Sequence, residues 1–197
     1  MRAAVLAAPR EIVIAEAPLP NPGPGQVRVR IAGCGVCASN LPPWEGQPWF
    51  EYPMAPGQLG HEAWGRVDAL GPGVTGLGVG ERVTMLSGHA YAEFDVAEAA
   101  QVVPLPEALD GRPFPGEPLG CAMNILRRSA IAPGSSVAIV GIGFLGALLT
   151  RLATRAGARV IAVTRRPYAL AVAREMGAAD LVPMDDHTGI IRRVGDL

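Results

Sequence analysis

The stretch Val137-Ala138-Ile139-Val140-Gly141-Ile142-Gly143-Phe144-Leu145-Gly146 decides the fold of the second half of this 197-residue chain. Its first four residues are wholly apolar, as in a buried strand of a parallel sheet. Three glycines follow at the spacing GxGxxG, and residues 144–156 then carry apolar side chains at helical spacing. A strand, a glycine-rich turn and a helix in this order form a dinucleotide-binding fingerprint.

Each residue of this turn has a physical role in that interpretation. Gly141 permits the tight turn, Gly143 lets the backbone approach a pyrophosphate, and Gly146 lets the helix pack closely on the strand. The helix N-terminus at Phe144 and Leu145 offers unpaired N–H groups and a positive dipole end to the phosphates. We therefore expect these five residues to bind a cofactor. The alternative is a glycine-rich turn in another kind of α/β protein.

The end of the next predicted strand, residues 159–163, indicates which cofactor is bound. Enzymes that use NAD usually place Asp or Glu about 20 residues beyond the turn, where it holds the ribose hydroxyls. This chain has Thr164, Arg165 and Arg166 there. Two guanidiniums and no carboxylate favour a 2′-phosphate, so we expect NADP rather than NAD. The alternative is a solvated arginine pair.

The wider pattern predicts two domains. After residue 130, a second helix over 168–176 and a strand from 180–183 complete a β-α-β-α-β order, which is half of a doubly wound parallel sheet. Before it, short strands over 27–31, 63–67 and 81–86 alternate with Gly/Pro turns and predict a barrel or sandwich. A helix is expected over 121–131. The predicted domains are 1–130 and 131–197.

Composition excludes several functional classes. The net charge of −1 gives no reason to expect nucleic acid or an anionic membrane surface as a partner. No stretch reaches the roughly 18 consecutive apolar residues of a membrane helix, and the N-terminus does not read as a signal peptide. Three cysteines do not suggest a disulfide framework. We expect a cytoplasmic protein that acts on a small molecule.

The first domain contains residues of metal-ligand type. Cys34 and Cys37 form a CxxC, which is compatible with a redox pair, with half of a structural zinc site, or with one metal ligand beside a bystander cysteine. Two ordinary buried cysteines are the alternative. His61 is followed by Glu62. A catalytic zinc takes three protein ligands and leaves its fourth position open. Cys37 and His61 supply two, and Glu117 or Cys121 is available as the third.

In these motifs the sequence resembles the zinc-dependent medium-chain dehydrogenase/reductase family, which includes alcohol, sorbitol and threonine dehydrogenases. The resemblance runs through the whole chain and is carried by residues 22–27, 34–39, 60–65, 80–83, 117–119 and 141–146. It implies a GroES-like β-barrel domain followed by a Rossmann domain. It also implies hydride transfer between an alcohol or polyol, or its carbonyl form, and a nicotinamide cofactor.

The resemblance also implies roles for individual residues. Cys37 and His61 match zinc ligands, and Glu62 matches a carboxylate that can approach the metal as an alternate ligand. Ser39 matches the hydroxyl that relays the substrate proton.

The third ligand is less directly implied. The spacing back from Gly141 favours Glu117. Its Glu-Pro-Leu context also resembles the polyol dehydrogenase branch, where glutamate is the ligand. Cys121 remains a rival.

Several departures from the family bear on these expectations. Asn40 replaces the acidic residue usual after the relay hydroxyl, and Pro42 replaces an outer relay histidine. The four-cysteine structural zinc lobe is missing, so one zinc is expected.

The family's chains continue well past residue 197, so this chain is expected to supply only the first half of the Rossmann sheet. The exposed edge of such a half-sheet favours a homo-oligomer. The rival functions are a zinc-free quinone or enoyl reductase of the same superfamily, and an inactive cofactor- or zinc-binding remnant.

Overall fold

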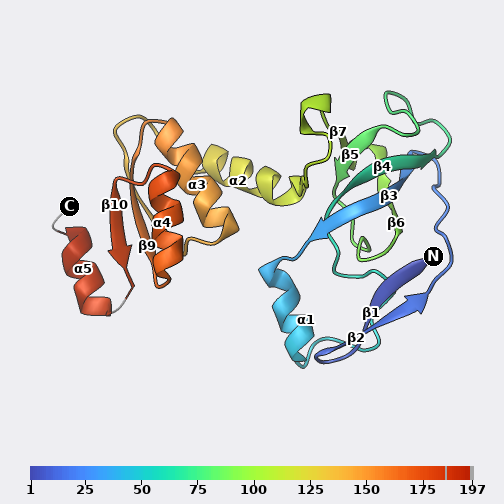
Figure 1. Ribbon diagram of the computed structural model, residues 1–197, viewed down its shortest axis with the longest axis horizontal. Coiled ribbons are helices and arrows are strands. Elements are labelled where there is room, and N and C mark those ends of the chain that lie inside the picture. The colour runs from blue at the N-terminus through green and yellow to red at the C-terminus, as the bar shows by residue number, and fades with distance from the viewer. Residues whose placement is uncertain (185, 196–197) are drawn as a thin grey trace. The chain divides into compact units, whose positions relative to one another are not determined.

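The computed structural model describes residues 1–184 and 186–195 and contains two compact units, Met1–Glu117 and Pro118–Leu197 (Figure 1). The first unit thus ends before the sequence-based boundary near residue 130. Residues 185, 196 and 197 of the second predicted domain lie outside the described residues.

The first unit consists of antiparallel strands. Its larger sheet has the order β6-β3-β4-β5-β7, and a hairpin is formed by the first two strands. The strands are β1 (Arg2–Ala8), β2 (Glu11–Glu16), β3 (Gln26–Gly35), β4 (Glu62–Leu70), β5 (Arg82–Met85), β6 (Phe94–Glu98) and β7 (Val102–Pro104). The short helix α1 (Leu41–Glu45) follows β3, and 3₁₀ turns lie at Ala38–Asn40, Ala99–Gln101 and Glu107–Leu109. The expected strands over 27–31, 63–67 and 81–86 are therefore present.

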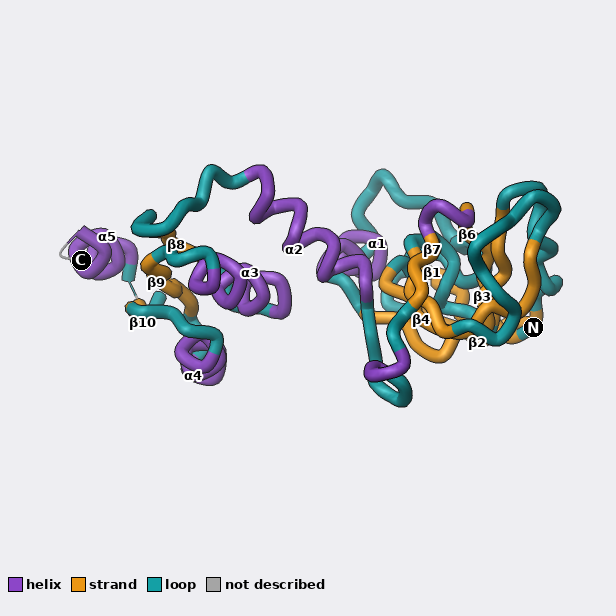
Figure 2. The backbone as a smooth tube through the Cα atoms, turned by 90° about the horizontal axis from the view of Figure 1, so that it is seen from above, coloured by secondary structure: helices purple, strands orange, loops and turns teal. Residues whose placement is uncertain are grey.

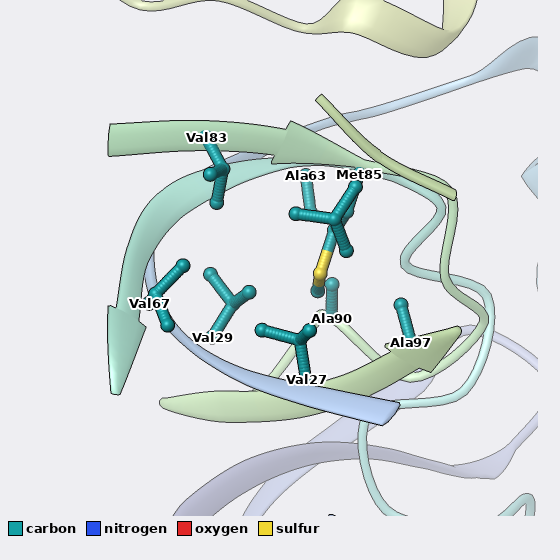
Figure 3. Close-up of a cluster of buried hydrophobic side chains, with 9 residues drawn as sticks. Val27, Val29, Ala63, Val67, Val83, Met85, Ala90 and Ala97 are labelled. Carbon is teal, nitrogen blue, oxygen red and sulfur yellow. The ribbon is translucent and has the colours of Figure 1, made fainter. Parts of the chain in front are cut away.

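The large sheet curls around its own core as a half-barrel (Figure 3). Val27 and Val29 alternate with charged residues along β3, and both are fully buried. They meet Val67 of β4 and Val83 and Met85 of β5 in one apolar cluster. The alternation in the sequence is thus the pattern of a strand with one buried face, since successive side chains point to opposite sides of a sheet.

The second unit is a three-stranded parallel sheet with helices. Its strand order is β10-β9-β8, from β8 (Ser136–Val140), β9 (Arg159–Thr164) and β10 (Asp180–Pro183). Helix α3 (Phe144–Arg155) packs on β8 and β9, and α4 (Pro167–Glu175) on β9 and β10 (Figure 2). Helix α5 (His187–Gly195) follows β10. The predicted β-α-β-α-β order is confirmed, and among the described residues every helix is too short or too polar to cross a bilayer.

Helix α2 (Gly116–Arg128) differs from the expectation of a helix over 121–131. Pro118 lies in the first turn of this helix. Proline is compatible with that place, because the N–H groups of a first turn have no acceptor within the helix. The helix therefore begins early enough to include Glu117.

Gly65 allows β3 and β4 to pair closely, and its replacement tests this pairing. A Cβ at this position would lie 2.1 Å from the Arg30 carbonyl oxygen on β3. Neither backbone has room to move within the sheet, so Gly65→Ala is expected to lower the free energy of unfolding by about 1–3 kcal/mol. Urea denaturation measures the change.

Gly78→Ala is the matched control, because an added Cβ there meets nothing within 4 Å and the backbone is not left-handed. Equal stability of the two variants would contradict the close approach of the strands.

Candidate metal centre and cofactor turn

Three residues of metal-ligand type meet where β3 ends and β4 begins. Cys37 lies just beyond β3 and precedes the 3₁₀ turn Ala38–Asn40, whereas His61 directly precedes β4. Glu62 is the first residue of β4 and pairs with Gly35 across the ladder. The ligand atoms of Cys37, His61 and Glu62 all lie within 4.8 Å of one another.

Gly35 makes room for the carboxylate of this cluster. A Cβ on Gly35 would lie 1.9 Å from Glu62 Oε2, so only glycine lets the Glu62 side chain lie across the end of β3. Glu62 is buried, with 8% of its surface exposed. Sulfur, imidazole nitrogen and carboxylate oxygen are the three kinds of ligand that zinc takes in proteins. The side chains present therefore fit a zinc ion.

The cluster also favours the thiolate form of its cysteine. Hydrogen bonds with the side chain and backbone of Ser39 lower the pKa of the Cys37 thiol, and His61 adds to the effect. Burial by itself lowers the pKa of His61. Hydrogen bonds with Cys37 and Leu59 and the charges of Cys37 and Glu117 outweigh burial, so the pKa of His61 is raised. Ser39 is itself exposed to solvent.

Cys34 differs from Cys37 in its surroundings. Burial raises the pKa of its thiol to about 11, and its Sγ lies 3.4 Å from the Gly35 carbonyl oxygen. A thiol of this kind is a poor nucleophile at neutral pH, since the thiolate is the reactive form. These surroundings favour the interpretation in which Cys37 is the ligand and Cys34 a core residue.

Glu117, the expected third ligand, lies near the cluster without belonging to it. Among the described residues the cluster contains Cys37, His61 and Glu62, and the charge of Glu117 acts on His61. Cys121, the rival, is an exposed residue of α2 in the second unit. Glu117 as third ligand stays a prediction. Of the candidate carboxylates, Glu62 is the one that the cluster with Cys37 and His61 contains.

Thr84 and Tyr91 also adjoin the site, although the sequence analysis does not single them out. The Thr84 hydroxyl donates to the Ala63 carbonyl at 2.8 Å and accepts from the Gly116 N–H at 3.0 Å. This buried bridge fastens the start of α2, and with it Glu117, to the beginning of β4. Such contacts join distant parts of the chain, and no local spacing in the sequence signals them.

A mainly apolar pocket of about 640 Å³ in the first unit extends to Cys37. Trp44 of α1 lines it, together with Asn40 and Tyr91. Trp49 and Phe50 are two further aromatic residues that follow α1 in the chain. They form a ring contact with centroids 6.0 Å apart, and neither is among the residues that line this pocket.

The glycine turn of the second unit has the geometry that its sequence indicates. Gly141 has a φ of +91°, a left-handed conformation that favours glycine. A Cβ on Gly146 would lie 2.2 Å from the Gly141 carbonyl oxygen, whereas a Cβ on Gly143 would meet nothing within 4 Å. Gly146 thus serves helix packing and Gly143 leaves open space before α3, which begins at Phe144 and continues through Leu145.

The expected cofactor-selecting residues border a pocket of about 480 Å³ beside this turn. Thr164, Arg165 and Arg166 line it together with Gly141. Thr164 is buried at the end of β9, and both arginines are exposed. Two guanidiniums at the mouth of this pocket suit a phosphate group.

Comparisons with known proteins agree with this architecture. Residues 23–107 match the alcohol dehydrogenase GroES-like domain. An alcohol dehydrogenase of Geobacillus stearothermophilus is 33% identical over 80% of this chain and 55% of its own length. A sorbitol dehydrogenase of Halalkalibacterium halodurans is 31% identical over 64% of this chain and 45% of its own length. The chain thus spans about half the length of these relatives.

A solved structure extends the likeness through both units. The quinone oxidoreductase of Pseudomonas syringae pv. Tomato DC3000 matches with a TM-score of 0.82 at 25% identity. The match covers 99% of this chain and 63% of that one.

The bridge made by Thr84 is tested by removing its hydroxyl. Thr84→Val keeps the shape of the side chain but leaves the Ala63 carbonyl and the Gly116 N–H without their partner. We expect the free energy of unfolding to fall by about 1–3 kcal/mol, because buried polar groups lose their hydrogen bonds. Thr84→Ser, which retains the hydroxyl, is the control in chemical denaturation. A Thr84→Val protein as stable as Thr84→Ser would contradict the bridge.

Proposed function

The chain belongs to the medium-chain dehydrogenase/reductase family of alcohol and polyol dehydrogenases, and on that premise we propose that it is a zinc-dependent alcohol or polyol dehydrogenase that uses NADP. The observation that carries the proposal is the cluster of Cys37, His61 and Glu62, with ligand atoms within 4.8 Å of one another. The substrate is a small alcohol, or the corresponding ketone or aldehyde.

The proposed zinc site uses residues of the first unit. Cys37 and His61 hold the ion, and Glu117 is the proposed third ligand, with Glu62 as the alternate and Cys121 as the rival. Zinc at this place supplies a Lewis acid that lowers the pKa of an alcohol oxygen. The lowered pKa of the Cys37 thiol supports the assignment, since a cysteine binds a metal as its deprotonated form.

Proton removal is assigned to Ser39. Its hydroxyl is hydrogen-bonded to Cys37 and exposed to solvent, so it lies between the cluster and bulk water. We propose that Ser39 accepts the alcohol proton and passes it outward, as a hydroxyl can in general acid–base catalysis.

The proposed cofactor site lies in the second unit. The turn from Gly141 to Gly146 holds the pyrophosphate against the N-terminus of α3, and Arg165 and Arg166 pair with the 2′-phosphate of NADP. NADP bound there supplies the acceptor for the substrate hydride. A homo-oligomer and a cytoplasmic location stay predictions.

A zinc-free quinone reductase is the second candidate, and the likeness to the Pseudomonas syringae enzyme favours it. It predicts activity that does not depend on Cys37 or His61. The convergence of sulfur, nitrogen and carboxylate oxygen on one point, with Gly35 left open for Glu62, supports the zinc proposal instead.

The zinc proposal is tested by Cys37→Ser. We expect the wild-type chain to retain one zinc ion and the variant to retain none, because a serine hydroxyl is not a thiolate ligand. Elemental analysis of the dialysed proteins measures the metal, and alcohol-dependent reduction of NADP measures turnover. Cys34→Ser is the matched control and should keep its zinc. Wild-type zinc content in Cys37→Ser would exclude the site.

The zinc content of further variants identifies the third ligand. Loss of zinc affinity in Glu117→Gln, with Glu62→Gln unaffected, would support Glu117. The opposite result would assign the role to Glu62, and a loss confined to Cys121→Ser would assign it to that cysteine.

The cofactor preference is tested by Arg165→Ala combined with Arg166→Ala. Charged hydrogen bonds contribute about 1.5–3 kcal/mol, so NADPH affinity should fall by roughly 10- to 100-fold while NADH affinity stays unchanged. Titration of the 197-residue chain by nucleotide fluorescence measures both. Arg155→Ala, at the far end of α3, is the control. An equal loss for NADPH and NADH would contradict 2′-phosphate recognition.

A further inference from the structure

Asn40 is a buried polar residue placed between the two segments that carry Cys37 and His61. Only 9% of its surface is exposed. Its Oδ1 accepts a hydrogen bond from the Cys37 backbone N–H at 3.1 Å, and its Nδ2 donates to the Leu59 carbonyl at 3.2 Å. One side chain therefore fastens the loop after β3 to the loop before β4.

The Leu59 carbonyl has a second donor in the site. It lies 2.9 Å from His61 Nδ1, and a carbonyl oxygen accepts hydrogen bonds but cannot donate them. The proton of a neutral His61 ring must therefore be on Nδ1 for this bond to form. Nε2 then carries the lone pair that binds a metal, an arrangement that partners of ligating histidines commonly impose.

The Leu59 carbonyl is held in an uncommon backbone conformation. Leu59 has a φ of +80°, which costs a non-glycine residue energy unless the surroundings hold it. The Asn40 amide contacts its carbonyl directly, and the Ala90 N–H donates to the adjacent Gly60 carbonyl at 3.0 Å. These contacts direct the Leu59 oxygen at the imidazole.

Tyr91 completes the arrangement around Asn40. Its hydroxyl donates to Asn40 Oδ1 at 2.9 Å and lies 3.1 Å from the Gly35 carbonyl oxygen. Its backbone N–H donates to Gly57 at 3.1 Å, in the loop that leads to His61. With Oδ1 accepting from two donors, the amide nitrogen is oriented toward Leu59.

An aspartate cannot make the same set of contacts. An ionised carboxylate only accepts hydrogen bonds, so it retains the bonds from Cys37 and Tyr91 but loses the one to Leu59. It also sets one carboxylate oxygen against the Leu59 carbonyl oxygen. The amide is the side chain of this size that accepts on one side and donates on the other.

We propose that Asn40 is a positioning residue that fixes the Nδ1–H tautomer of His61 through the Leu59 carbonyl and holds the Cys37 and His61 segments in ligand geometry. Tyr91 orients the Asn40 amide for this role. The link to metal affinity rests on the proposed zinc function, whereas the effect on the tautomer does not.

The test compares Asn40→Asp with the wild-type 197-residue chain in its metal-free form. Long-range ¹H–¹⁵N NMR reports the tautomer of each neutral imidazole, and His61→Gln identifies the His61 signals among three histidines. We expect Nδ1–H to predominate in the wild type and Nε2–H to rise in Asn40→Asp. Retention of Nδ1–H in Asn40→Asp would overturn the proposal.

Zinc affinity is the second readout and uses zinc alone in competition with a chromophoric chelator. Loss of a residue that orients a ligating histidine typically costs about 10- to 100-fold in affinity, and we expect a loss in that range for Asn40→Asp. If the tautomer changes as expected but the wild type binds no zinc, the positioning role holds and the proposed metal function fails. An unchanged affinity in a zinc-binding chain overturns the positioning role.

Far-UV circular dichroism shows whether Asn40→Asp folds. If it does not, two tyrosine variants test the proposal. Tyr91→Phe removes a hydrogen bond to Asn40 and should raise the Nε2–H fraction and weaken zinc binding. Tyr52→Phe removes a comparable, partly buried hydroxyl, whose partner is the Pro43 carbonyl, and should change neither. Equal behaviour of the two variants would overturn the proposal.

Discussion

The antiparallel pairing of β3 with β4 is the constraint on which the candidate metal site depends. It sets Gly35 opposite Glu62, so the residues just beyond β3 and just before β4 meet at one end of this strand pair. The apolar face of the same strands is held in the half-barrel by Val27, Val29 and Val67. Because side chains alternate along a strand, a shift of one residue in this pairing would exchange the buried and exposed faces. The register that buries the valines is therefore also the register that brings the candidate ligands together.

The cofactor turn could be predicted from sequence almost completely, because its geometry is local. Gly141, Gly143 and Gly146 lie within six residues. Gly141 is favoured by its own left-handed backbone, and Gly146 by the Gly141 carbonyl five residues before it. The strands and helices around the turn follow from apolar runs and helical spacing. The early start of α2 was missed because Pro118 suggests a boundary, although proline is tolerated in a first turn.

The residue types of the candidate metal site could be predicted from the sequence, but their arrangement could not. Cys37 and His61 are recognisable by residue type and neighbours, but the contacts of Thr84, Tyr91 and Asn40 join segments that are far apart in sequence. No periodicity predicts a hydrogen bond between residues 40 and 59. Such contacts depend on the tertiary fold, and they determine which atoms of a ligand side chain are available.

Asn40 shows how a departure from a family pattern is to be interpreted. In the sequence it takes the place of an acidic residue, which predicts weaker or different support for the metal. In the structure the amide makes one contact that a carboxylate cannot, because the Leu59 carbonyl requires a donor. A neutral residue at this place also adds no negative charge beside Cys37. The departure is therefore consistent with a metal site whose histidine is oriented through the backbone of Leu59 rather than by a carboxylate.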